Sequence, residues 1–293
     1  MCGRAGDEIV GYVDNPRREP GNIAAMSQGE FAPHARALDK DTVLCISLAA
    51  RPSNIGTRFH NYLYNALGLN YVYKAFAPTS IEQAVDAIRG LRIRGAAVSM
   101  PYKEAVIDLV DQMEHSASAI GSVNTIVNPD GVLHAYNTDY QAVADLLAGS
   151  GFDTSWKVAV AGSGGMAKAV VAALKHSGFT DGLVVARNQD TGTDLAAVYG
   201  YEYRSSLTAD DRPDLLVNAT PVGMAGGIDA EALPYPDDAV ASAKAAFDVV
   251  AMPPDTPLVR AFRESGRPAI SGDAVIAGQA AAQFALYTGV TPS

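Results

Sequence analysis

The chain alternates short apolar runs with stretches of helical periodicity, and this pattern predicts its elements. Apolar runs of a few residues between polar turns predict buried strands, whereas apolar residues spaced three and four apart predict helices. In the first half the predicted strands are Thr42–Leu48, Tyr71–Phe76, Gly95–Met100, Ser122–Val127 and Val132–Tyr136. The predicted helices there are Thr57–Leu67, Glu82–Gly90 (with Ser80 or Thr79 as its cap), Lys103–Val110 and Asp139–Leu147. The sequence Asn-Pro-Asp-Gly at 128–131 predicts a hairpin turn between the last two strands.

From Lys157 onward, strands and helices alternate regularly. The predicted strands are Lys157–Ala161, Leu183–Ala186, Tyr201–Tyr203, Leu215–Asn218, Ala246–Val250 and Pro268–Ile270, and a helix over Ala277–Tyr287 closes the chain. Such alternation is typical of a parallel, doubly wound sheet of the Rossmann type. The sequence therefore predicts the α/β class with two domains, an α/β substrate domain and a Rossmann-like dinucleotide-binding domain.

The two halves set the expected domain boundaries. Residues 1–138 are expected to form the substrate-binding and catalytic domain, within which 1–41 lacks a clear period and is interpreted as an extension. Residues 139–267 are expected to form the dinucleotide-binding domain, and 268–293 a C-terminal helix that returns to the first domain. A chain of 293 residues is long enough for two cores, and ligands are expected in the cleft between them.

Composition narrows the class of partner. The formal net charge of −10 argues against nucleic acid or an anionic membrane as the main partner, because both favour basic surfaces. No apolar run reaches the ~18 residues that a membrane span needs. With only Cys2 and Cys45, the chain does not resemble a disulfide-stapled protein, which favours the cytoplasm. The histidines show no metal-ligand spacing. We expect a small-molecule partner, no metal, and a monomer or homodimer.

A glycine-rich turn is the most informative motif. Gly162, Gly164 and Ala167 match the G-x-G-x-x-G/A spacing directly after a predicted strand and before a helix. The first glycine permits a tight turn, the second lets the backbone approach a pyrophosphate, and the small third residue lets strand and helix pack closely. The expected cofactor contacts in this turn are Gly162, Ser163, Gly164, Gly165, Met166 and Ala167.

Arg187 indicates which dinucleotide is bound. It follows the next predicted strand, about 20 residues past the motif, where an acid would read a ribose 2′-hydroxyl. A guanidinium there instead suits a 2′-phosphate, so the expected cofactor is NADP. An alternative is a solvated arginine at a strand end. NAD also stays open, because the next residues, Asn-Gln-Asp, are not basic. S-adenosylmethionine in a methyltransferase is disfavoured, because its ribose would prefer an acid.

Two polar residues near strand ends are candidates for catalysis. Lys103 follows a strand–proline turn, at the kind of sheet edge where open α/β sheets bind ligands. An ammonium there can give a proton to the alkoxide that develops when a ketone is reduced. Asp139 follows the hairpin and can hold that ammonium in place. The alternatives are an exposed lysine and an aspartate that caps the next helix.

Other candidates have ordinary interpretations too. Asn124 can bond the local backbone or donate to a substrate hydroxyl. Gln279 lies in an alanine-rich helix, where a lone glutamine is usually a surface residue. Thr220 and Met224 follow a strand, at the edge where a nicotinamide would lie, but they also fit an ordinary proline–glycine loop.

Taken together, several motifs resemble the shikimate dehydrogenase family, from about Val43 to the C-terminus. The motifs are Val98–Lys103, Gly121–Thr125, Asn137–Asp139, Gly162–Ala167, Asn218–Met224, Asp248–Val250, Thr256–Leu258 and Gly278–Gln279. The resemblance implies NADP-linked interconversion of a 3-dehydro cyclohexene acid and its alcohol, with Lys103 and Asp139 as the catalytic pair. It also implies substrate contacts by Ser99, Asn124 and Gln279, and cofactor contacts by Asn218, Thr220, Met224 and Val250.

The chain departs from the family pattern around the substrate. Where the family has a Ser-x-Ser-Pro turn for the substrate carboxylate, this chain has residues 51–57, in which Ser53, Asn54 and Thr57 supply the polar groups. Ala97 replaces an asparagine and Ala251 a tyrosine. A missing hydrogen bond in a buried site costs ~1–3 kcal/mol. These departures resemble a divergent, shikimate dehydrogenase-like branch. With these departures, quinate, aminoshikimate or another ring acid stays open as the substrate. A non-catalytic binding protein is the alternative from another functional class.

Overall fold

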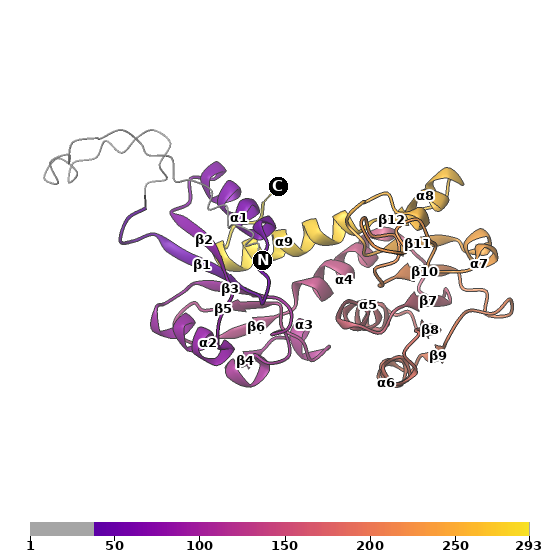
Figure 1. The fold of residues 1–293 in the computed structure, drawn as a ribbon, viewed down its shortest axis with the longest axis horizontal. Helices are drawn as coiled ribbons and strands as arrows, with labels where there is room; N and C mark the ends of the chain where they lie inside the picture. The colour runs from indigo at the N-terminus through magenta and orange to yellow at the C-terminus, as the bar shows by residue number, and fades with distance from the viewer. Residues whose placement is uncertain (1–37, 293) are drawn as a thin grey trace, which may run out of the picture. The chain divides into compact units, whose positions relative to one another are not determined.

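The structure is a computed structural model that describes residues 38–292. From Thr42 onward the chain forms one compact unit, built on two six-stranded sheets (Figure 1). The predicted extension, 1–41, lies almost wholly outside the described residues. None of the helices in the described part of the chain has the length and apolar character that crossing a membrane requires.

The first sheet combines parallel and antiparallel strands in the order β2-β1-β3-β5-β6-β4. Its strands are β1 (Val43–Leu48), β2 (Tyr71–Phe76), β3 (Gly95–Val98), β4 (Gln112–Met113), β5 (Thr125–Val127) and β6 (His134–Tyr136). Its helices are α1 (Asn54–Ala66), α2 (Ile81–Gly90), the 3-10 helix η2 (Ile107–Leu109) and α3 (His115–Ser118). Strand β5 runs antiparallel to β3, with Ala97 opposite Thr125. This pairing brings the start of β5 to the carboxyl end of β3.

The second sheet is wholly parallel, with the order β12-β11-β10-β7-β8-β9. Its strands are β7 (Val158–Ala161), β8 (Gly182–Val185), β9 (Glu202–Arg204), β10 (Leu215–Asn218), β11 (Ala245–Asp248) and β12 (Ala269–Ile270). The helices between them are α5 (Gly165–His176), α6 (Gln189–Tyr199), α7 (Asp237–Ser242) and α8 (Pro257–Glu264). The predicted α/β class and doubly wound sheet are confirmed.

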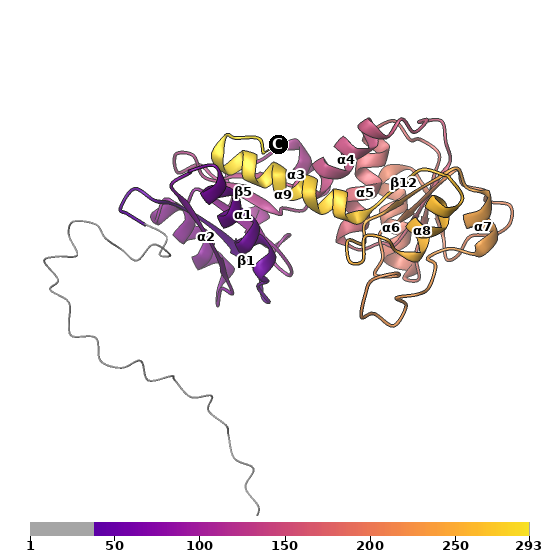
Figure 2. The ribbon, with the colours of Figure 1, turned by 90° about the horizontal axis from the view of Figure 1, so that it is seen from above.

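Two long helices, α4 (Thr138–Ser150) and α9 (Gly272–Thr288), lie side by side (Figures 1 and 2). Small residues permit this close packing, because a Cβ added at Gly278 would lie 3.2 Å from the Cβ of Ala142. Helix α9 begins against the segment that follows β11, where a Cβ at Gly272 would overlap the Val249 carbonyl. Near its other end, Phe284 and Tyr287 are buried in the core of the first sheet.

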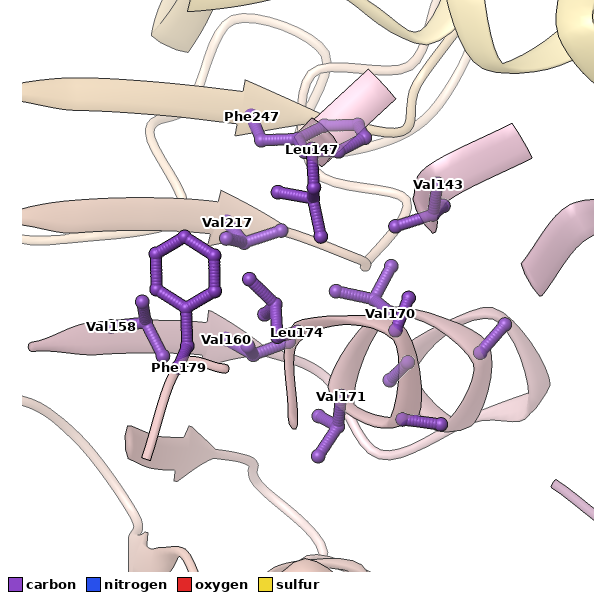
Figure 3. Close-up of a cluster of buried hydrophobic side chains, with 14 of the residues drawn as sticks. Val143, Leu147, Val158, Val160, Val170, Val171, Leu174, Phe179, Val217 and Phe247 are labelled. Carbon is purple, nitrogen blue, oxygen red and sulfur yellow. The ribbon is translucent and has the colours of Figure 1, made fainter. Parts of the chain in front are cut away.

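Apolar side chains from α4, α5 and the second sheet form the largest core (Figure 3). Its buried members include Val143, Leu147, Val158, Val160, Val170, Val171, Leu174, Phe179, Val217 and Phe247. Continuous apolar strands such as β7 are buried on both faces, as parallel strands covered by helices must be. This core fixes the strand β7 from which the glycine turn leaves.

Three helix predictions need correction. The helix expected over Lys103–Val110 is wrong: turns cover 101–106, and only η2 follows. The Lys103 carbonyl accepts from the Val123 N–H (2.8 Å), a distant partner that replaces a helical one. Helix α1 begins at Asn54 rather than at Thr57, and α9 begins at Gly272. Ser80 does cap α2, since its Oγ accepts from the Gln83 N–H (3.2 Å). The short elements β4 and α3 had no clear signal in the sequence.

Candidate active site

Lys103 and Asp139 form an ion pair. The Lys103 Nζ lies 2.7 Å from the Asp139 Oδ2, and the side chains are 30% and 15% exposed. Lys103 sits in the turn after β3, where the Tyr102 N–H donates to the Ser99 carbonyl (2.9 Å). Asp139 lies in the first turn of α4, where a carboxylate interacts favourably with the positive end of the helix. The pair is thus accessible to a ligand and held from both sides.

Asp139 is not the cap of α4, although that interpretation was plausible from the sequence. The cap is Asn137, whose Oδ1 accepts from the Tyr140 N–H (3.0 Å). The Asn137 Nδ2 also donates to the Ser122 carbonyl (2.9 Å), which ties the start of α4 to the segment before β5. Because Asn137 satisfies the helix end, the Asp139 carboxylate is left to bind Lys103.

Asn124 is buried directly before β5, close to the end of β3. Its backbone carbonyl accepts from the Val98 N–H (2.8 Å). Its side-chain Oδ1 accepts from the Thr138 N–H (2.8 Å), the Thr138 hydroxyl (3.1 Å) and the Thr125 hydroxyl (2.8 Å). Thr138 immediately precedes Asp139, so these bonds bring Asn124 close to the ion pair.

Gln279 reaches the same cluster from α9. Its Nε2 lies 3.4 Å from the Thr138 Oγ1, so it is not the surface glutamine that composition suggested. Ser99 is exposed at the end of β3, and its backbone N–H donates to the Leu48 carbonyl (2.9 Å). These two residues and Asn124 therefore approach the Lys103 segment from three elements.

The divergent turn at 51–57 follows β1, next to the Lys103 segment. Because β1 and β3 are neighbours, the Ala50 N–H donates to the Met100 carbonyl (3.2 Å). Ser53 and Asn54 are exposed and Thr57 is half-buried. Ser53 occupies the cap position of α1 but makes no side-chain cap bond. The three polar side chains therefore lie beyond the sheet edge that bears Ser99.

The glycine turn has the predicted strand–turn–helix geometry. Gly162 follows β7 with φ +113°, a conformation that side chains disfavour, and a Cβ there would lie 2.8 Å from the Ala219 carbonyl oxygen. Gly164 caps α5 in an extended conformation, and no atom lies within 4 Å of a Cβ built on it. Ala167 is fully buried, as the third motif position requires. The turn leaves open space at the N-terminus of α5, which suits a pyrophosphate.

A cavity of about 440 Å³ adjoins this turn. It is lined by Gly162, Ser163, Gly164, Arg187, Asn188, Ser206, Thr220 and Pro221, among others. Arg187 is exposed after β8, while Asn188 caps α6 by accepting from the Thr191 N–H (3.1 Å). Ser163 and Thr191 share a hydroxyl hydrogen bond (2.7 Å), which ties the turn to α6. The lining brings the glycine turn and the Arg187 guanidinium to one cavity, a combination that suits a phosphorylated dinucleotide.

Buried polar groups support the side of this cavity that Thr220 and Pro221 line. Asn218 is fully buried and donates to the Val222 carbonyl (2.9 Å) and to Asp248 (3.0 Å), while its Oδ1 accepts from the Thr220 hydroxyl (2.7 Å). Asp248 also accepts from the Val250 N–H and the Thr256 hydroxyl. Burial raises the pKa of the Asp248 carboxyl, although these donors oppose the shift.

These bonds join the loops after β10 and β11. Asn218 and Val250 are both buried, whereas Met224 is exposed on the loop after β10. Asn218 and Asp248 therefore hold the loop that carries Thr220 and Met224.

The ion pair and the glycine turn are linked by a second ion pair. Glu104, next to Lys103, binds Lys168 of α5 (3.1 Å). A further cavity, of about 600 Å³, has Ile120 and Gly121 on one wall and Gly164 and Gly165 on another. The candidate catalytic segment thus lies near the first turn of α5, although the two are far apart in sequence.

Sequence reasoning missed Gln283, and it assigned no role to four further polar residues that lie in the recognised motifs: Thr125, Thr138, Asp248 and Thr256. The clearest available signal was in α9, where Gln279 and Gln283 are four residues apart and so lie on one helix face. Residues 38–292 contain no cluster of histidine, cysteine or acidic side chains able to hold a metal ion.

Comparison with known proteins identifies relatives. Residues 54–126 match the model of the shikimate dehydrogenase substrate binding domain. A shikimate dehydrogenase-like protein of Haemophilus influenzae is 53% identical over 256 residues, which is 87% of this chain and 94% of that protein. The solved structure of a shikimate 5-dehydrogenase-like protein, also 53% identical, matches with a TM-score of 0.86 over 88% of this chain and 95% of that one.

Two ligand complexes are more distant. Shikimate 5-dehydrogenase of Thermus thermophilus, in complex with NADP(H) and shikimate, is 28% identical, with a TM-score of 0.73 over 86% of this chain and 95% of its own. Quinate dehydrogenase of Corynebacterium glutamicum, in complex with NAD, is 25% identical, with a TM-score of 0.75 over 86% and 95%.

Fold and relatives define the class as nicotinamide-dependent oxidoreductases that act on CH–OH groups, as expected from the sequence. Within that class, the chain belongs to the shikimate dehydrogenase family.

Proposed function

We propose that the protein is an NADP(H)-dependent dehydrogenase that interconverts a ketone and an alcohol on a ring acid related to shikimate. The observation that carries this proposal is the 2.7 Å contact between the Lys103 Nζ and the Asp139 Oδ2, beside the Asn124–Thr138 cluster. A structural ion pair does not need partly accessible charged groups such as these, which are 30% and 15% exposed, next to a buried polar cluster. A reaction that moves a proton to or from a hydroxyl does need them.

The two members of the pair have distinct roles in the proposal. Bound NADPH supplies the hydride that reduces the carbonyl carbon. Lys103 gives the proton that converts the developing alkoxide into a hydroxyl, and it takes that proton in the reverse direction. Asp139 holds the Lys103 ammonium and accepts a hydrogen bond from the substrate. Binding both reactants in one cleft supplies proximity and excludes water.

Substrate orientation is assigned to polar groups around the pair. The Nδ2 of Asn124 and the side chains of Ser99 and Gln279 bind ring hydroxyls. Ser53, Asn54 and Thr57 bind the carboxylate, because they are the polar side chains in the accessible turn beyond β1. Hydroxyl and amide donors suit a carboxylate without adding a further charge.

Cofactor binding is assigned to the glycine turn and its cavity. Gly162–Ala167 at the N-terminus of α5 would hold the pyrophosphate, and Arg187 would hold the 2′-phosphate of NADP. Thr220, Met224 and Val250 would hold the nicotinamide, while the buried Asn218 acts by holding the loop that carries Thr220 and Met224. In this proposal residues 1–138 and 268–293 serve the substrate, and 139–267 serve the cofactor.

Two departures around the substrate keep several ring acids as candidates. Ala97 and Ala251 provide no polar side chain where related enzymes present an amide and a phenol. Shikimate is the first candidate, and quinate and aminoshikimate are the next, because each keeps the carboxylate and a ring hydroxyl.

A panel assay tests the proposal. Each acid is mixed with NADP or NAD, and nicotinamide reduction is followed by absorbance with the wild-type protein. We expect turnover with at least one acid and a preference for NADP. Binding of NADP and a ring acid by calorimetry without turnover on any of them would favour a non-catalytic binding protein instead.

A further inference from the structure

We propose that Gln283 is a positioning residue for the substrate: through Thr125 it fixes the Asn124 amide so that Nδ2 faces the ligand. The inference rests on the proposed function, in which Asn124 binds a ring hydroxyl. Gln283 lies on α9, one turn beyond Gln279, and it is only 5% exposed. A buried amide must find partners, and those that Gln283 uses lead directly to Asn124.

The orientation of the Gln283 amide follows from a backbone group. Its terminal atom lies 3.3 Å from the Asn124 carbonyl oxygen and 2.8 Å from the Thr125 Oγ1. A carbonyl oxygen can only accept, so the atom of Gln283 that faces it is the Nε2. Gln283 therefore donates to Thr125, and the Thr125 hydroxyl is left to direct its own proton elsewhere.

The proton of Thr125 points to Asn124. The Thr125 Oγ1 lies 2.8 Å from the Asn124 Oδ1, and it donates there because an amide oxygen can only accept. The backbone N–H of Thr138, which can only donate, is also 2.8 Å from this oxygen. Donors thus surround one end of the Asn124 amide. Among the described residues Nδ2 has no hydrogen-bond partner, so it is the end available to a substrate hydroxyl.

The buried ring of His60 lies beside Gln283, and its Nδ1 has no hydrogen-bond partner among the described residues. The His60 ring is 1% exposed and stacks on Tyr73, with ring centroids 4.4 Å apart. Burial lowers the pKa of His60 to about 4, while a hydrogen bond with the Gln283 side chain opposes that shift. His60 is therefore neutral and adds no charge beside Gln283. The network from His60 to Asn124 carries no net charge at neutral pH.

Removing the Gln283 donor frees the Thr125 hydroxyl. That hydroxyl can then turn to the Thr138 Oγ1, 3.4 Å away, and Asn124 loses a donor that holds its oxygen. The Asn124 amide is then held by Thr138 alone, so its Nδ2 is less firmly oriented and binds a hydroxyl less well. The reacting carbonyl and Lys103 are not displaced, so binding suffers more than the chemical step.

Two variants test this in the full-length protein. Gln283→Met keeps the length of the side chain but removes its donor, and Gln283→Glu restores a donor only when protonated. With Gln283→Met we expect the KM for the ring acid to rise about tenfold, the typical value of one hydrogen bond, with kcat within about threefold and the KM for NADP unchanged. With Gln283→Glu the ring-acid KM should fall toward the wild-type value as the pH is lowered. The matched control is Gln83→Met, on the exposed face of α2.

A readout independent of catalysis separates this inference from the proposed function. The side-chain amide resonance of Asn124, assigned by its loss in Asn124→Asp, should shift or broaden in Gln283→Met and stay unchanged in Gln83→Met. An unchanged resonance together with an unchanged KM overturns the role of Gln283. If the resonance moves but the wild-type protein turns over no ring acid, the positioning of Asn124 stands and only the proposed function fails.

Discussion

The Lys103 ammonium and the Asp139 carboxylate meet across 36 residues of sequence, with Nζ and Oδ2 2.7 Å apart. Lys103 lies in a turn outside any helix or strand, whereas Asp139 lies in the first turn of α4. Lys103 is held because its carbonyl accepts from the Val123 N–H. The Asp139 carboxylate is available to bind Lys103 because Asn137 caps α4. Val123 and Asn137 flank the hairpin of β5 and β6, so this hairpin places the two charges together.

Removing the ammonium tests its role in proton transfer. For Lys103→Ala we expect kcat to fall about 10²–10⁴-fold, the usual contribution of a positioned acid or base. The KM for NADP should stay within about threefold, because Lys103 does not line the glycine-turn cavity. Steady-state kinetics on the best ring acid measure both. The control is Lys244→Ala. Lys244 lies just before β11, and its ammonium pairs with Asp214. Full turnover by Lys103→Ala would remove the lysine from the mechanism.

Two glycines of one turn should respond differently to alanine. In Gly162→Ala the new Cβ meets the Ala219 oxygen at 2.8 Å with φ at +113°, so we expect the unfolding free energy to fall by about 1–3 kcal/mol or more. In Gly164→Ala nothing obstructs the Cβ within the protein. Stability should change by less than about 1 kcal/mol, while the KM for NADP rises because the methyl group occupies pyrophosphate space. Urea unfolding and cofactor titration separate the two effects. Equal losses of stability would contradict this assignment.

Arg187 should decide between the two dinucleotides. A hydrogen bond to a charged group contributes about 1.5–3 kcal/mol, so Arg187→Ala should raise the KM for NADP roughly 10–100-fold. The KM for NAD should change by less than about threefold, since NAD lacks the 2′-phosphate. Kinetics with both cofactors give the ratio, and Arg260→Ala, an exposed arginine on α8, serves as control. A parallel rise in both KM values would show that Arg187 does not read the 2′-phosphate.

Local patterns predicted the parts of the fold that depend on neighbouring residues. Strand β10 has the predicted bounds, and the hairpin turn forms as Asn-Pro-Asp-Gly indicates, with the Asn128 Oδ1 accepting from the Gly131 N–H (2.7 Å). The glycine turn also follows from its spacing, because strand, turn and helix are contiguous. In each case the stabilising partner lies within a few residues.

Elements stabilised by distant partners were not predictable in the same way. The helix expected at Lys103 fails because its carbonyl bonds Val123, twenty residues on. Gln283 was overlooked because its partner Thr125 is 158 residues away, and only the tertiary structure brings them to 2.8 Å. The motif resemblance identified Asn124 and Gln279 as substrate contacts. It gave no information on the network that orients Asn124.

Buried His60 should make stability depend on pH. Burial lowers its pKa to about 4 from the 6.5 expected in the unfolded chain, so between these values the unfolded state binds a proton that the folded state does not. The unfolding free energy must therefore decrease as the pH falls from 6.5 to 4, by about 3 kcal/mol in total for this residue. His60→Phe keeps a ring against Tyr73 and removes the titration, so its loss of stability between pH 7 and pH 4 should be smaller than that of the wild type by about this amount. Urea unfolding at several pH values measures the difference in unfolding free energy between the variant and the wild type. This difference should stay constant between pH 7 and pH 8. Parallel curves for the two proteins below pH 6 would contradict the assignment.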